Sequence, residues 1–206
     1  MHIEVKHPCI EHKLAEVRSN DQPIGKFREL ISEITMLLSF RALEDLEQKE
    51  VEIETPIAKT ICKKIKGEII VLPILRAGLG MLDGFLSVMP SSKVGFLGMF
   101  RNEETSLPES YYENIPRGSQ DDLHLIVDPM LATGGSTIAA IDLLKEKKIK
   151  KIIVVCIVTC PEGIEAVEKI HPDVKIYTAS IDSHLNEKNY IVPGLGDAGD
   201  RLFGTY

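Results

Sequence analysis

Apolar residues recur at different spacings in the first third of the chain and in the rest of it. After Gly25, apolar side chains lie three or four residues apart, which is the period of an amphipathic helix; they are Phe27, Leu30, Ile31, Ile34, Leu37 and Leu38. A second, shorter helix is predicted from about Pro56 to Ile65, because proline suits a first helical turn. The residues before Gly25 are polar and indicate irregular structure.

Beyond Gly67, short apolar runs alternate with helical periods. Residues 69–72 form an uninterrupted apolar run before Pro73, which is typical of a strand buried on both faces. The alternation predicts an α/β fold, a mainly parallel twisted sheet with helices on both faces. The other predicted elements are helices at 79–88, 135–147 and 161–170 and strands at 94–99, 123–127, 149–158 and 174–180.

Two long segments, 101–122 and 186–206, fit neither period. Loops of this length are uncommon in compact domains unless they are functional or disordered. Ligands of parallel sheets bind beyond the carboxyl ends of the strands, so the turns after the strands are the first places to look for a site. No repeat, low-complexity tract or linker divides the chain, and we expect one domain over residues 1–206.

Composition excludes several function classes. Hydrophobic residues make up 44% of the chain and charged residues 27%, which supplies enough apolar material for a core. The net charge of −7 and the lack of a basic stripe argue against a nucleic-acid partner. No apolar run approaches the ~20 residues that cross a bilayer, so no membrane partner is expected. The four cysteines form no disulfide framework and the N-terminus resembles no signal peptide, which indicates the cytoplasm.

The turn at residues 125–136 carries the most specific chemistry. An apolar strand ends in Asp128, and Thr133-Gly134-Gly135-Ser136 then leads into a predicted helix. Small residues let successive N–H groups point at one anion, and the helix N-terminus adds a partial positive charge. The spacing matches neither a Walker loop nor a dinucleotide-binding glycine motif. An ordinary glycine-rich N-cap is the alternative, but the acidic residue ahead of the loop favours a sugar phosphate, with carboxylate for hydroxyls and amides for phosphate.

This turn resembles the signature with which type I phosphoribosyltransferases bind 5-phosphoribosyl 1-diphosphate (PRPP). It departs from the usual signature at Pro129, where the family commonly has a second acidic residue, so that Asp128 alone would accept from the ribose hydroxyls. The form Asp-Pro-Met-Leu-Ala-Thr-Gly-Gly-Ser is similar to that of uracil phosphoribosyltransferases. The segments 73–79, 99–105 and 190–200 resemble the same family, as do His7-Pro8 and His12-Lys13-Leu14.

The resemblance implies a function in pyrimidine salvage, in which uracil and PRPP are converted to UMP and diphosphate. It also implies a type I fold with an extended loop or hairpin arm and a C-terminal base-binding segment. Arg76 follows a buried strand and precedes Ala77-Gly78, a setting that suits diphosphate because a guanidinium supplies paired donors. The resemblance makes Arg101 a second diphosphate contact, carried by a lid that excludes water.

Further site residues are implied by the same resemblance. Asp128, Arg101 and Asp197 are the candidate catalytic residues. Asp197 is expected to touch a hydrated Mg²⁺ complex, with a helix or turn cap as its alternative role. The expected PRPP-binding residues are Arg76, Arg101, Asp128, Pro129, Met130, Leu131, Ala132, Thr133, Gly134, Gly135, Ser136 and Asp197.

The C-terminal segment is expected to read the base with its backbone, because residues 190–200 have few polar side chains. The resemblance places uracil at Ile191, Gly196, Asp197 and Ala198. No cluster has the spacing of a protein metal site, so Mg²⁺ is expected through PRPP and water. The family also suggests a homodimer or homotetramer and a possible GTP effector. A nucleic-acid-binding regulator with the same fold and a transferase for another base are the alternatives.

Overall fold

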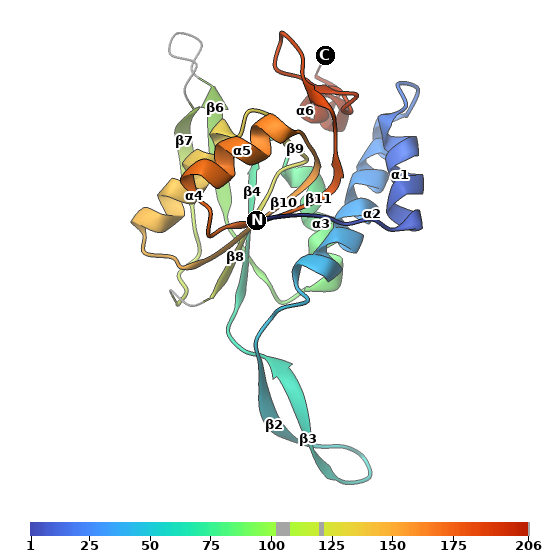
Figure 1. The fold of residues 1–206 in the computed structure, drawn as a ribbon. Coiled ribbons are helices and arrows are strands. Elements are labelled where there is room, and N and C mark those ends of the chain that lie inside the picture. Colours follow the sequence, from blue (N-terminus) through green and yellow to red (C-terminus); the bar gives the residue numbers. More distant parts are fainter. Residues whose placement is uncertain (102–107, 120–121, 206) are drawn as a thin grey trace.

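The computed structural model describes residues 1–101, 108–119 and 122–205 (Figure 1). A nine-stranded sheet runs through the described part of the chain, and every strand pair in it is parallel except β6–β7. The sheet confirms the predicted α/β class. Its main path is β1 (His2–Glu4), β11 (Lys175–Ile181), β10 (Lys151–Thr159), β8 (Leu123–Val127), β4 (Ile69–Leu75), β6 (Phe96–Arg101) and β7 (Pro108–Asn114), with short β5 (Lys93–Val94) beside β4 and β9 (Met130–Leu131) beside β10.

Helices cover both faces of this sheet (Figure 1). One face packs against α1 (Pro8–Arg18), α2 (Ile24–Ala42) and α3 (Leu79–Val88), and the other against α4 (Gly135–Glu146) and α5 (Pro161–Ile170). Successive residues of the central strands enter opposite cores: Val71 and Leu125 lie with the first group of helices, and Ile70 and Ile126 with the second. This double burial explains why these strands are continuous apolar runs instead of alternating ones.

The helix predicted at 56–65 is wrong. The chain forms a separate hairpin of β2 (Gln48–Glu54) and β3 (Lys59–Ile65), which extends away from the body in Figure 1. Pro56 lies in the turn, where the Thr55 hydroxyl accepts from the N–H groups of Ile57 and Ala58 at 3.2 and 3.0 Å. Apolar and charged residues alternate in β2, at Val51 and Ile53, but the apolar residues of 57–65 have helical spacing, which led to the wrong interpretation.

Three segments that we expected to be irregular contain regular structure. Residues before Gly25 form β1 and α1, with the His7 side chain accepting from Cys9 N at 3.1 Å as the helix N-cap. The segment 101–122 contains β7, which pairs with β6 as a hairpin arm; residues 102–107 lie outside the described part. The segment after 186 contains β13 (Ile191–Val192), paired with β12 (His184–Leu185), and α6 (Ala198–Phe203). None of the described helices is long and apolar enough to span a bilayer.

Candidate active site

The turn after β8 is fixed to the carboxyl edge of the sheet by backbone bonds to β10. Asp128 N donates to Val155 O at 3.2 Å, and Pro129 O accepts from the N–H groups of Ile157 and Val158 at 3.0 Å each. Pairing with β10 then resumes at Met130 through β9. The parallel sheet therefore holds Asp128 where the strand order places ligands.

A left-handed glycine turns this chain into α4. Gly134 has φ +81° and is the N-cap of α4, and no side chain caps the helix there. The first N–H groups of a helix have no intrahelical partners, so those of Gly135 and Ser136 are oriented to meet an anion. Thr133 is exposed and Gly134 is buried, which puts the open end of the loop at the surface. The arrangement matches the anion cradle predicted from the sequence.

Helix α5 supports the cradle from behind, which sequence analysis did not foresee. A Cβ at Gly163 would lie 2.4 Å from Ala132 O and 2.7 Å from Leu131 O, so the helix approaches the loop backbone as only glycine allows. The Thr159 hydroxyl also donates to Leu131 O at 2.9 Å. Leu131 is 1% exposed and its carbonyl is bonded to Thr159, so this residue anchors the loop to β10.

Burial changes the acidity of Asp128. Loss of hydration raises the pKa of its carboxyl to about 7, although Met130 N donates to Oδ1 at 3.4 Å and opposes the rise. Among the described residues, no ion pair with Asp128 is formed in the free protein. The carboxyl is therefore prepared for donors that arrive with a ligand, such as ribose hydroxyls.

Arg76 lies between the end of β4 and helix α6. Its Nη1 donates to the Thr205 hydroxyl at 3.2 Å and its Nη2 to Asp200 Oδ1 at 3.3 Å, and the guanidinium is 57% exposed. A Cβ at Gly78 would lie 2.5 Å from Val127 O, so this loop packs directly against the end of β8. The two turns that were predicted to bind PRPP are thus neighbours. Asp200 and Thr205 were missed by sequence analysis.

The structure gives less detail for the candidate residues Arg101 and Asp197. Arg101 ends β6, opposite Pro108 in β7, but its side chain lies outside the described part, as do residues 102–107 and 120–121 of the expected lid. Asp197 is the N-cap of α6, where Oδ1 accepts from Asp200 N at 2.9 Å. The alternative capping role is therefore present in the free protein. The described residues contain no cluster of metal-ligating side chains.

The C-terminal segment brings the expected uracil residues around one turn. Asn186 N donates to Tyr190 O at 2.8 Å, so the next pair, Leu185 and Ile191, is a non-hydrogen-bonded pair whose backbone groups point away from the partner strand. Gly194 and Gly196 have φ +59° and +74°, and Ala198 is buried at the start of α6. The backbone groups of Ile191 are therefore not bonded to the partner strand, and the residue as a whole is 5% exposed.

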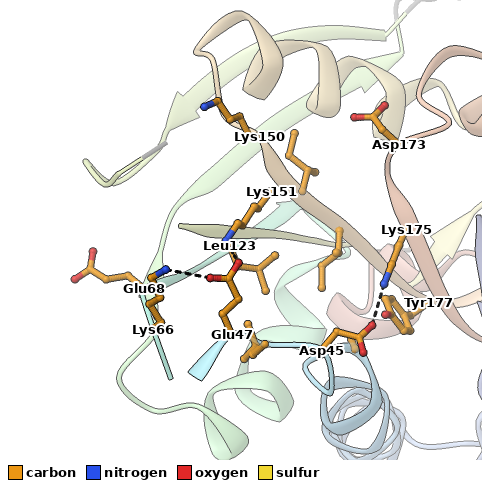
Figure 2. Close-up of a pocket in the computed structure, with 14 residues that line it drawn as sticks. Asp45, Glu47, Lys66, Glu68, Leu123, Lys150, Lys151, Asp173, Lys175 and Tyr177 are labelled. Carbon is orange, nitrogen blue, oxygen red and sulfur yellow. Dashed lines mark hydrogen bonds and ion pairs between the residues drawn. The ribbon is translucent and has the colours of Figure 1, made fainter. Parts of the chain in front are cut away.

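A cavity of about 270 Å³ lies at the other edge of the sheet, away from the turn after β8 (Figure 2). It is lined by the starts of β8, β10 and β11 and carries both signs of charge. Glu47 accepts from Lys66 and Lys151 at 3.3 and 2.8 Å, and Asp45 accepts from Lys175 at 2.9 Å. Carboxylates thus pair with three of the four lysines that line this cavity, which neutralises most of its positive charge.

The architecture and the turn after β8 define a class, the phosphoribosyltransferases of type I fold. An adenine phosphoribosyltransferase from Trypanosoma brucei shares this fold, with a TM-score of 0.60 and 13% identity over 91% of this chain and 86% of that one. Within the class, the chain belongs to the uracil phosphoribosyltransferase family, whose family model matches residues 4–205.

Close relatives agree with this assignment. A uracil phosphoribosyltransferase from Clostridium botulinum is 53% identical over 204 residues, which cover 98% of both chains. One from Streptococcus pneumoniae is 52% identical over 202 residues, 98% of this chain and 97% of the relative. The solved structure of the AQ2163 protein from Aquifex aeolicus has a TM-score of 0.95 and 39% identity, covering 100% of this chain and 99% of that one.

Proposed function

We propose that this protein converts uracil and PRPP to UMP and diphosphate. The observation that carries the proposal is the turn after β8, where a half-buried, unpaired Asp128 precedes an open helix N-terminus. This pairing fits a ribose 5-phosphate, since a carboxylate accepts from hydroxyls and helix amides donate to phosphate. Membership of the uracil phosphoribosyltransferase family over residues 4–205 supports uracil as the acceptor.

PRPP would span the two neighbouring turns. In this proposal the amides of Gly135 and Ser136 hold the 5-phosphate and Asp128 accepts from the ribose hydroxyls. Arg76 and Arg101 meet the diphosphate, for which Arg76 exchanges its weak bonds to Asp200 and Thr205. A guanidinium that is 57% exposed can make this exchange with little loss of packing.

Uracil would be read by the backbone around the C-terminal turn. Its edge presents an acceptor, a donor and an acceptor, which an N–H, a C=O and an N–H can match. We assign these groups to Ile191, Gly196 and Ala198, with Asp197 beside the base. The two positive-φ glycines of the turn permit the close approach of a planar ring.

Magnesium fits this site only as a partner of PRPP. A hard cation that keeps several waters needs few protein ligands, and the described residues offer no metal cluster. Asp197 would contact the hydrated cation through Oδ2, because Oδ1 caps α6. When bound, Mg²⁺ supplies positive charge to the diphosphate oxygens.

The proposed reaction is a displacement at the anomeric carbon. A bond forms from the uracil nitrogen to C1′ while the C1′–O bond breaks, and the electron pair and negative charge leave with diphosphate. The uracil N–H proton is released to solvent or to the departing diphosphate. The chain contributes by aligning the two substrates and by stabilising the leaving charge with Arg76 and Arg101. No covalent enzyme intermediate is required.

The proposal also covers the cellular compartment, the oligomeric state and a possible effector. The free cysteines Cys9, Cys62, Cys156 and Cys160 suit a reducing cytoplasm. A homodimer or homotetramer is supported by the projecting β2–β3 hairpin, since an isolated two-stranded hairpin is marginally stable in water. GTP is proposed only as a candidate effector, to be tested by adding it to the assay.

A nucleobase panel with PRPP tests the function. Uracil should give UMP and diphosphate, identified as products, whereas cytosine should react with a kcat/KM lower by about 10⁴ or more because it reverses two of the hydrogen-bonding groups. Use of cytosine within about tenfold of uracil would refute backbone reading by this turn. Reaction with a different base would establish another base-specific transferase, and RNA retention without diphosphate release would establish a regulator.

A further inference from the structure

The turn at residues 193–196 is held in place by side chains from distant parts of the chain. The turn itself offers little to fix its shape, because Gly194 and Gly196 have positive φ and glycine is the most flexible residue. Gly194 and Leu195 are nevertheless buried, while Pro193 and Gly196 are exposed. One part of the turn is therefore anchored in the protein and the adjacent part faces solvent.

Arg18 and Asp182 bind both backbone groups of Gly194. Gly194 N donates to Asp182 Oδ2 at 2.8 Å, and Gly194 O accepts from Arg18 Nη1 at 2.6 Å. The two side chains also bind each other in a bidentate pair, with Nη1 to Oδ2 at 2.7 Å and Nη2 to Oδ1 at 2.6 Å. Such a fork has a defined geometry, so it sets the position of the peptide groups that it binds.

The pair is itself rigidly supported. The Asp182 side chain is 2% exposed and that of Arg18 is 23% exposed. Ser180 Oγ donates to Asp182 Oδ1 at 2.8 Å and accepts from Arg18 Nη2 at 3.1 Å, and Asp182 N donates to Thr159 O at 2.7 Å. Burial opposes ionisation of Asp182, but the bonds from Arg18 and Ser180 outweigh it and lower the pKa. The carboxylate is thus charged and fully engaged.

A third side chain holds the next residue of the turn. Arg201 Nη1 donates to Leu195 O at 2.7 Å and its Nη2 to Ser19 O at 2.5 Å, while the guanidinium lies 4.2 Å from the centre of the Phe27 ring. Ser19 immediately follows Arg18 at the end of α1. The end of α1, the segment after β11 and helix α6 therefore all converge on Gly194 and Leu195.

We infer that Arg18 and Asp182 are positioning residues for base recognition, which they achieve by fixing Gly194 between the backbone groups of Ile191 and Gly196. The inference rests on the proposed function and deepens it. A site that reads a base with peptide groups cannot adjust through side-chain rotamers, so its accuracy depends on where the backbone is held. The ion pair acts on the base through the turn and does not touch the base itself.

Arg18→Lys tests the inference, because lysine keeps the charge but cannot form the bidentate fork. We expect KM for uracil to rise by about ten- to a hundredfold, as for a small misplacement of binding groups. The kcat/KM ratio of uracil to cytosine should fall, while KM for PRPP changes by less than about threefold, since separate sites respond independently. Asp182→Asn should act in the same direction, because it removes the charge and keeps the shape.

Arg28→Lys is the matched control. Arg28 Nε also donates to a backbone carbonyl of α6, Leu202 O at 2.7 Å, but it does not contact the turn. The Arg28→Lys variant should have the same kcat/KM ratio of uracil to cytosine as the wild type. Thermal melting of each variant ensures that the assays use folded protein, and Ser180→Ala provides a milder perturbation of the same pair if Arg18→Lys does not fold.

The outcomes distinguish failure of the proposed function from failure of the positioning role of Arg18 and Asp182. If the wild type does not form UMP from uracil and PRPP, the proposed function fails. If it does, but folded Arg18→Lys and Asp182→Asn keep the wild-type KM for uracil and the wild-type selectivity, the positioning role is wrong. A lowered melting temperature with unchanged selectivity would likewise assign the pair a purely structural role.

Discussion

At the scale of single residues, Asp128 meets two conflicting demands. The proposed function requires it to be charged so that it accepts from ribose hydroxyls, yet burial raises its pKa to about 7 in the free protein. A raised pKa in the folded state means that the folded protein holds the proton more tightly than the unfolded chain. Stability from this group is therefore present below the unfolded pKa of 3.8 and is lost as pH rises through 7.

Asp128→Asn should accordingly make the protein more stable and less active. The neutral amide does not titrate, so at pH 8 we expect the variant to melt about 3–6 °C above the wild type, with a smaller difference at pH 5. Its kcat/KM for PRPP should fall by about 10- to 100-fold, because charge-assisted bonds to the hydroxyls are lost. Scanning calorimetry and steady-state kinetics test the two effects. An unchanged KM for PRPP would show that Asp128 does not contact PRPP.

The same titration predicts the pH dependence of the wild type. Since the ionised carboxylate is the form that accepts from hydroxyls, kcat/KM for PRPP should increase as pH rises through about 7 and then level off. The profile for Asp128→Asn should lack this step. A step of equal size in the variant would show that another group is titrating.

Arg76 and Arg101 should act mainly after PRPP is bound. Their contacts strengthen as charge develops on the leaving diphosphate, so Arg76→Ala and Arg101→Ala should each lower kcat by about 10²-fold with little change in KM for uracil. Arg117→Ala is the control, because Arg117 is an exposed arginine that lines a pocket beside the start of β8. A change confined to uracil would contradict the placement of both arginines.

At the scale of elements, the proposed phosphate-binding loop after β8 packs closely against α5. Gly163→Ala would place a methyl group 2.4 Å from Ala132 O, so either the helix or the loop must move. We expect KM for PRPP to rise by at least about tenfold. The melting temperature should fall by several degrees, because overpacking a buried site lowers the free energy of unfolding by about 1–3 kcal/mol. Kinetics and melting curves of purified variants measure both effects.

Gly25→Ala is the matched control for this helical glycine. A Cβ at Gly25 meets nothing within 4 Å. This variant should keep its kinetics and melt at the same temperature or slightly higher, because alanine restricts the unfolded chain. If Gly163→Ala behaves in the same way, the loop does not depend on α5.

At the scale of the whole molecule, the turns of the proposed active site and the hairpin occupy opposite ends. The turns lie at the carboxyl edge of the sheet, while β2 and β3 project from the edge where β4 begins (Figure 1). The hairpin exposes Ile57 by 96% and Ile61 by 67%. Exposed apolar side chains on a projecting hairpin favour contact with another protein surface, which we propose to be a second copy of the chain.

Analytical ultracentrifugation tests this assembly. The wild type should sediment as a dimer or tetramer, and Ile57→Asp/Ile61→Asp should shift the distribution toward smaller species, since a charge is costly in an apolar interface. Ile170→Asp serves as the control, because Ile170 is also exposed but lies at the end of α5. A monomeric wild type at micromolar concentration would contradict the proposal.

Local patterns were sufficient where a segment is specified by its own residues. The buried strands were predictable because apolar residues 69–72 and 123–127 have to be covered on both faces. The turn from Asp128 to Ser136 was predictable for the same kind of reason, since the acidic residue, the glycines and the helix start are contiguous. The hairpin at 48–65 was missed because the apolar residues of 57–65 have helical spacing, whereas the strand there is defined by its pairing with β2.

The sequence by itself thus determined the α/β class and indicated an anion-binding turn, while the family resemblance suggested the backbone reading of the base. Only the tertiary structure decided which distant residues support these features. Arg18 and Asp182 are 164 positions apart and Arg76 and Asp200 are 124 apart, so no local period connects them. Their partners are chosen by how the end of α1, the ends of the parallel strands and α6 pack together, and packing is a property of the whole folded chain.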